Sequence, residues 1–247
     1  MLKLIRDHRH TAFLAVLGAT YLARPAFEDS STVQLAFSLL LVGILMLALL
    51  TVEADATAEA GADRKVERRG WRRAAWLLAG IVIAERVESL VSPTRVLLTA
   101  GTISYLAFFL FVAASHFRTM LRAKRVTGET ISMSISTYLL IALAWSMVFE
   151  LMLSADPSSF DMGSLGKDTA SGHGSSFVLF IAYSLGALST NVVGDVAPVS
   201  LLARYATVIE GLIGQFYLAI LVARLVGMQM ATPPEQELPR RSTGEAS

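Results

Sequence analysis

The chain has 247 residues, of which 54% are hydrophobic and 17% charged, with a mean hydropathy of +0.56 and a formal net charge of +1. A soluble domain carries about 25% charged residues, so this composition indicates an integral protein of the lipid bilayer. The near-zero net charge gives no reason to expect a nucleic-acid partner. The absence of Cys excludes disulfides and thiolate metal sites.

Motifs of the common enzyme classes are also absent. The chain contains no HExxH, no P-loop and no GxSxG sequence. Its histidines show no metal-ligand spacing; they are His8, His10, His116 and His173. We therefore predict no catalytic residues, no bound metal and no cofactor, and a protein that is not an enzyme.

Six apolar runs are long enough to cross about 30 Å of hydrocarbon. They lie at 11–27, 33–52, 74–91, 96–117, 134–153 and 204–228. These runs predict an all-α membrane protein. The first run also has features of a cleaved signal peptide, and its removal would leave the orientation of the later runs unchanged. A further run, at 176–188, makes only about 20 Å of helix, which is too short to cross the bilayer but long enough to enter it halfway.

Basic residues indicate the orientation of these runs. They concentrate at 3–9, 64–73, 118–125 and 240–241. All four groups fall on one side of the membrane if the N-terminus is cytoplasmic and if 176–198 enters and leaves by the opposite face. The positive-inside rule therefore predicts a multi-pass protein of the inner (plasma) membrane with both termini cytoplasmic, and it favours a re-entrant segment.

The polar segments outside the apolar runs are of two kinds. The outer loop at 154–175 is rich in Gly, Ser and Asp, and nothing in its composition leads us to expect order. The tail at 231–247 combines several Pro with few apolar residues, which predicts disorder. The tail is too short to form a cytoplasmic ligand-binding domain.

The last apolar run resembles a known helix. Residues 203–227, ARYATVIEGLIGQFYLAILVARLVG, are similar to the inner helix of small bacterial six-span potassium channels. The stretch GDVAPVSLL at 194–202 resembles the exit of the selectivity filter in that family. The linker RVTGETI at 125–131 and the span TYLLIALAWSMVFELML at 137–153 fit the same pattern.

The resemblance implies a tetrameric cation-channel fold, with four identical chains around one axis. Four peripheral membrane helices and their linkers would occupy 1–130, and the pore domain would occupy 131–230. Within the pore domain we expect an outer helix, a turret, a re-entrant pore helix at 176–188, a filter at 189–195 and an inner helix at 204–228.

The expected filter departs from that of the family, which reads Thr-Val-Gly-Tyr-Gly-Asp. This chain has Ser189, Thr190, Asn191, Val192, Val193, Gly194 and Asp195. A potassium filter points successive backbone carbonyls at the ion, and this takes backbone angles that Gly adopts readily and Val resists. We expect rings of Asn191 amides and Asp195 carboxylates instead, in a pore for K⁺ and Na⁺ with little preference for K⁺. Two alternatives stay open: a K⁺-selective filter of different geometry, and a scaffold or regulatory subunit that does not conduct.

Four side chains near the filter are candidates for its support: Tyr183, Ser184, Arg204 and Glu210. A carboxylate at the depth of Glu210 needs a partner, and Ser184, Ser189, the Tyr183 hydroxyl or Arg204 of a neighbouring subunit could supply one. Glu210 would then act as a structural brace or as a proton sensor. Gly211 and Gly214 allow either a gating hinge or close helix packing.

Overall fold

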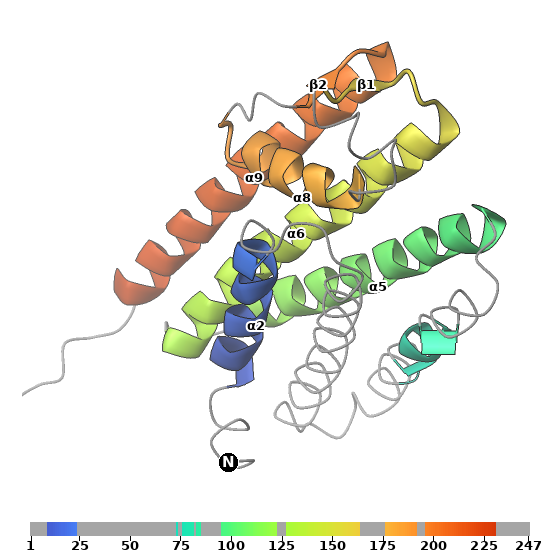
Figure 1. The fold of residues 1–247 in the computed structure, drawn as a ribbon. Coiled ribbons are helices and arrows are strands. Elements are labelled where there is room, and N and C mark those ends of the chain that lie inside the picture. Colours follow the sequence, from blue (N-terminus) through green and yellow to red (C-terminus); the bar gives the residue numbers. More distant parts are fainter. Residues whose placement is uncertain are drawn as a thin grey trace, which may run out of the picture.

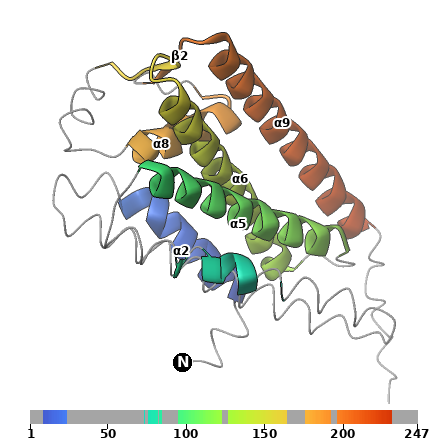
Figure 2. The same cartoon turned by 90° about the vertical axis from the view of Figure 1, so that its right-hand side faces the viewer.

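The computed structural model of the chain describes residues 9–23, 73, 76–81, 83–84, 95–122, 127–163, 176–191 and 196–230, and these are mostly helical. In chain order the elements are α2 (Arg9–Ala23), α5 (Arg95–Arg122), α6 (Gly128–Ala155), β1 (Phe160–Asp161), α8 (Ser176–Leu188), β2 (Ala197–Pro198) and α9 (Leu201–Met230). Figure 1 shows that α6 and α9 run alongside one another and that α8 and the short strands lie at the upper end of this pair. Figure 2 shows the same arrangement from the side.

Three helices in the described part of the chain are long and apolar enough to cross a membrane. The qualifying segments are Thr99–Leu121, Gly128–Ala155 and Leu201–Gly227. They confirm the prediction of a helical protein with membrane-spanning segments. Of the other predicted spans, 33–52 lies outside the described residues, while 11–27 and 74–91 are described only in part, as helix.

Helix α6 begins at Gly128, before the predicted start at 134. Thr127 is its N-cap: the Thr127 side-chain oxygen accepts a hydrogen bond from the backbone N–H of Thr130 at 3.2 Å. Such a bond satisfies one of the N–H groups that lack a partner in the first turn. Glu129 adds a negative charge beside the positive end of the helix dipole. The TGET sequence thus extends α6 beyond its apolar run.

The outer loop is more ordered than its composition predicts. The expectation that nothing at 154–175 requires order is wrong for the described part, which runs to Gly163. Phe160 is only 6% exposed, and β1 pairs antiparallel with β2, with Phe160 opposite Pro198. Burying a Phe side chain contributes about 1.5–3 kcal/mol, which is enough to fix a short loop. Residues 164–175 of the loop lie outside the described part.

The turn between α6 and β1 is closed by Asp156, which ends α6 as its C-cap residue. The Ser158 hydroxyl and the Ser158 backbone N–H donate hydrogen bonds to Asp156 Oδ1 at 2.6 and 3.0 Å. These hydrogen bonds hold the pKa of Asp156 below its ordinary value because they stabilise the ionised carboxylate.

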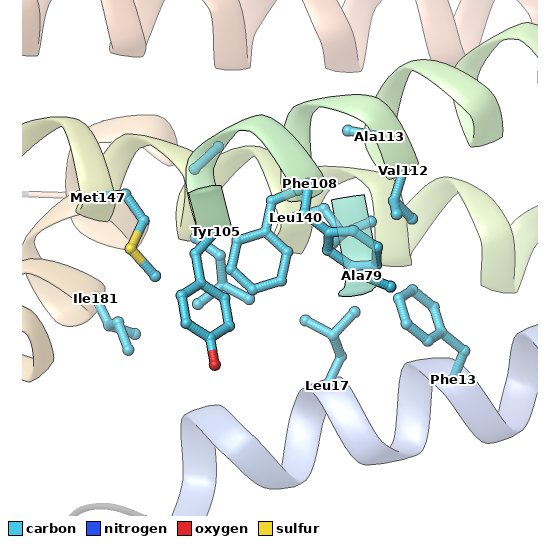
Figure 3. Close-up of a cluster of buried hydrophobic side chains, with 13 residues drawn as sticks. Phe13, Leu17, Ala79, Tyr105, Phe108, Val112, Ala113, Leu140, Met147 and Ile181 are labelled. Atoms are coloured by element: carbon cyan, nitrogen blue, oxygen red, sulfur yellow. The ribbon is translucent and has the colours of Figure 1, made fainter. Parts of the chain in front are cut away.

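Two clusters of buried side chains hold the helices together. Figure 3 shows the first, in which Phe13 of α2 and Phe108 of α5 lie in one group with Leu140 of α6. At the far end of this group, Ile181 of α8 lies beside Met147. The short helix α8 is therefore packed into the same core as the long helices.

The second cluster lies at the upper end of the molecule and is largely aromatic. Its rings come from α6, β1 and α8; they are Phe149, Phe160, Phe180 and Tyr183. The ring centroids of Phe160 and Phe180 are 4.9 Å apart, and those of Phe149 and Tyr183 are 5.2 Å apart, both edge to face. Such pairs contribute about 0.5–1.5 kcal/mol beyond their burial. The cluster fixes the outer loop and α8 to each other.

Candidate functional site

The predicted short helix is confirmed as α8, with the predicted bounds Ser176–Leu188. At 1.5 Å per residue its 13 residues make about 20 Å of helix. Figure 1 shows α8 alongside the upper halves of α6 and α9, both of which are much longer. The polar stretch that begins at Ser189 therefore starts part-way along α9 rather than at one of its ends.

The C-terminal end of α8 closes in a Schellman motif. The backbone N–H of Thr190 donates to Ala187 O at 3.1 Å, and that of Asn191 donates to Gly186 O at 2.8 Å. Thr190 has a φ of 59°, the left-handed conformation that this motif requires at the residue after the cap and that is usually filled by Gly. A β-branched residue there is strained by about 1–2 kcal/mol. The backbone at the start of the candidate filter is thus held in a costly conformation by two hydrogen bonds.

The side chains of this turn form a second set of hydrogen bonds. Ser189 Oγ donates to Leu185 O at 2.7 Å, and Asn191 Nδ2 donates to Ser189 Oγ at 3.0 Å. Asn191 is exposed. Within the described residues its amide oxygen accepts no hydrogen bond, and this oxygen is the atom that would contact a cation.

The chain is fixed again immediately after the candidate filter. Val196 is buried, and the next two residues form β2, which pairs with β1. Ser159 O accepts hydrogen bonds from the backbone N–H groups of Val199 at 2.9 Å and Ser200 at 3.2 Å. Arg204 Nε donates to Pro198 O at 3.2 Å. The predicted filter residues Val192, Val193, Gly194 and Asp195 lie outside the described residues.

Glu210 has the first of its predicted partners. Its side chain is fully buried, and its Oε1 is hydrogen-bonded to Ser184 Oγ of α8. Ser184 Oγ also lies 2.7 Å from Ala142 O of α6, to which it donates. A hydroxyl has one hydrogen, and a backbone carbonyl can only accept. The contacts of Ser184 are therefore both satisfied when Glu210 Oε1 carries a proton and donates it to Ser184, while Glu210 Oε2 is buried without a hydrogen-bond partner among the described residues. A neutral carboxyl also avoids the cost of a charge among apolar helices.

The other candidate partners of Glu210 have different contacts. The Tyr183 hydroxyl is 2.7 Å from Thr207 Oγ1 on α9. Arg204 contacts Pro198 of its own chain, as described above. Tyr183 and Ser184 thus join α8 to α9 by two neighbouring hydrogen bonds, and Arg204 holds the segment that leads into α9. A role of these residues in supporting a filter stays a prediction.

Gly211 and Gly214 lie where the end of α8 meets α9. A Cβ atom at Gly211 would be 3.3 Å from Ala187 O. A Cβ atom at Gly214 would overlap Leu188 O and lie 3.0 Å from the Leu188 carbonyl carbon. These contacts give both glycines a packing role, and α9 continues as one helix through them. A hinge at these positions stays a prediction.

Two hydrogen-bonded contacts that hold the helices together were not predicted from the sequence. The Ser176 hydroxyl, at the start of α8, donates to Glu150 Oε1 of α6 at 2.8 Å. At the opposite end of α9, Arg224 Nε donates to Met120 O at 3.1 Å, and Arg224 Nη2 donates to Leu121 O. Arg224 therefore caps the last carbonyls of α5. A Glu inside the apolar run of α6 was the signal for the first contact, whereas no local pattern predicts the second.

Comparisons with known proteins give no further assignment: no family model matches the chain, nor does any curated protein or solved structure. Among the described residues, no group of three or more His, Cys, Asp or Glu side chains is placed to hold a metal ion.

Proposed function

We propose that the chain is the pore-forming subunit of a homotetrameric cation channel, similar to the bacterial six-span potassium channels but with little selectivity for K⁺ over Na⁺. Its pore would be lined by 189–195 and by α9, in the plasma membrane with both termini cytoplasmic. The permeant ions would be K⁺ and Na⁺, moving down their gradients.

One observation carries the proposal: a short polar segment is anchored at both ends beside a helix long enough to span a membrane. The Schellman turn of α8 anchors Asn191, and on the other side Val196 is buried and the β1–β2 pair anchors the residues after it. Irregular backbone at membrane depth is tolerated only where protein buries it or where it borders water. A rigid frame around such a segment is what an ion pathway requires.

The charges at this site favour cations. The C-terminal end of a helix carries a partial negative charge, and α8 presents that end next to Thr190 and Asn191. The side-chain oxygen of Asn191 adds a neutral ligand, and Asp195, four residues later, adds a carboxylate that four chains would repeat as a ring. No Lys or Arg occurs between 168 and 203 to oppose them.

Weak selectivity follows from Val192 and Val193. A stack of inward-pointing carbonyls needs backbone conformations that Val adopts only with strain. A ring of side-chain amides coordinates a partly hydrated ion and distinguishes ionic radii less sharply than a carbonyl stack.

The purified protein, reconstituted in planar bilayers with K⁺ on one side, Na⁺ on the other and an impermeant anion, tests the proposal. We expect current that reverses near zero voltage. Asn191→Val should reduce the current strongly, because it removes the amide ring. The matched control is Ser154→Val, a polar-to-apolar change at the exposed end of α6, and it should leave the current unchanged.

The other outcomes identify the alternatives. A reversal near the K⁺ equilibrium potential means that a carbonyl filter forms despite the two valines. If the wild type is silent, the combined change of Asn191→Val, Val192→Gly and Val193→Tyr restores the sequence of a potassium filter. Current only in that variant indicates a native pore blocked by its own filter, and silence in both indicates a non-conducting scaffold or regulatory subunit.

A further inference from the structure

One face of α9 is packed and the others are exposed. The packed face contains Ala203, Glu210, Gly214 and Tyr217, which meet α6 and α8. These positions are separated by seven, four and three residues, the spacing of one stripe on a helix. The rest of α9 faces the surroundings of the single chain, which in a membrane are lipid, water or other copies of the chain.

The exposed surface of α9 has two largely apolar faces, and one of them is interrupted by an amide. The first carries bulky apolar side chains, and its members are Leu202, Ile209, Ile213, Phe216 and Ile220. The second carries the half-buried Gly211 and the exposed side chains of Val208, Gln215, Val222 and Val226. Gln215 is exposed and lies midway along the helix, where hydrocarbon is deepest for a spanning segment. Placing an amide in hydrocarbon without a hydrogen bond costs about 4–8 kcal/mol, so the Gln215 face borders water or protein.

The end of α8 lies on the same side of α9 as Gln215. Leu188 O meets Gly214, and Ala187 O meets Gly211. Gln215 is one helical turn after Gly211 and about 40° from it around the helix, so it continues the face that Gly211 begins. The polar stretch at 189–191 follows Leu188 directly in the chain, so the candidate filter begins close to the part of α9 that carries Gly211 and Gln215.

We propose that Gln215 forms a cation-binding ring in the water-filled path on the cytoplasmic side of the candidate filter. This inference rests on the proposed homotetrameric pore. Four amide oxygens would replace part of the hydration shell of a monovalent cation. Because the ring carries no net charge, it would hold the ion weakly and release it, as conduction requires.

The absence of Cys from the chain allows a direct test. Gln215→Cys and Phe216→Cys place a single thiol at nearly the same depth, about 100° apart around the helix. Phe216 is 65% exposed on the bulky apolar face, so it is the matched control. Both variants are reconstituted in liposomes and treated with a membrane-impermeant methanethiosulfonate carrying a quaternary ammonium, and modification is followed by the mass of the protein. Only a hydrated thiol ionises and reacts.

We expect Gln215→Cys to react at least about tenfold faster than Phe216→Cys. The cationic reagent should react faster than an uncharged reagent of similar size at position 215, and K⁺ should slow it more than a large organic cation at equal ionic strength. Val222→Cys, two turns further along the same face, repeats the accessibility test if Gln215→Cys fails to fold.

Equal rates at positions 215 and 216 overturn the proposal, because the Gln215 face is then dry. Fast modification at 215 that depends on neither reagent charge nor K⁺ also overturns it, since water is then present without a cation site. Modification is measured by mass and does not depend on current. The experiment can therefore reject the Gln215 ring and ion conduction independently of each other. Current without modification at 215 retains the channel and rejects the ring, whereas cation-sensitive modification without current retains the ring and rejects conduction.

Discussion

The contact between Gly214 and the end of α8 predicts a large effect from a single methyl group. In Gly214→Ala the new Cβ would overlap Leu188 O. This oxygen belongs to the backbone, so it cannot rotate away as a side chain can, and α8 has to move relative to α9. Inserting a methyl group into a tightly packed site costs typically about 1–3 kcal/mol.

The same substitution also gains helix propensity, about 1 kcal/mol for Gly to Ala in a helix interior. Gly227→Ala provides the control, because Gly227 lies in the same helix and its Cβ would meet nothing within 4 Å. The difference between the two variants therefore isolates the steric cost. At 2 kcal/mol that cost corresponds to a difference of about 4–8 °C in Tm for a chain of this size.

Thermal unfolding of the detergent-solubilised variants, followed by tryptophan fluorescence, measures the difference. We expect Gly227→Ala to melt at or above the temperature of the wild type and Gly214→Ala to melt several degrees lower. Gly211→Ala should lie between them, because its Cβ would be 3.3 Å from Ala187 O. Equal melting temperatures for Gly214→Ala and Gly227→Ala would refute the close packing of α8 on α9.

Substitutions at two further positions test the turn and the buried carboxyl. Thr190→Gly should raise the free energy of unfolding by about 1 kcal/mol, because Gly adopts the φ of 59° without strain. Thr190→Ala should bring no such gain. Chemical denaturation of the two variants measures the difference. Glu210→Gln should stay within about 0.5 kcal/mol of the wild type, since its amide donates to Ser184 as the protonated carboxyl does, whereas Glu210→Ala should lose at least about 2 kcal/mol. If Glu210→Gln destabilises the protein as much as Glu210→Ala, the inference that Glu210 is protonated is wrong.

The bounds of α8 could be predicted because the signals are local. An apolar run with polar residues on both sides defines a helix of 13 residues, and the structure has the same limits. The start of α6 was also encoded locally, in Thr127 and Glu129, but hydropathy alone places it too late. Apolar length measures the part of a helix that fits in hydrocarbon, whereas capping residues determine where the helix itself begins.

For contacts between distant residues, the sequence limited the set of possible partners but did not identify the actual one. Several hydroxyls near α8 were possible partners for Glu210, and only the rotation of α8 about its axis selects Ser184. Phe160 was a solitary aromatic residue in a Gly- and Ser-rich loop, which is a signal of burial, yet its pairing with Pro198 depends on how the loop returns to α9. Small residues such as Gly214 are equally compatible with bending and with packing until the neighbouring helix is placed.

The described frame around the candidate filter is made largely by backbone hydrogen bonds. On one side it is made by backbone hydrogen bonds to Gly186 and Ala187, and on the other by backbone hydrogen bonds to Ser159. None of these contacts involves a side chain at 192–195. These hydrogen bonds are donated by the backbone N–H groups of Thr190, Asn191, Val199 and Ser200, so side-chain substitutions at 192–195 leave the groups that form them in place. In the proposed channel, this gives a physical reason why Val192 and Val193 could change the permeant ions while the surrounding helices keep their arrangement.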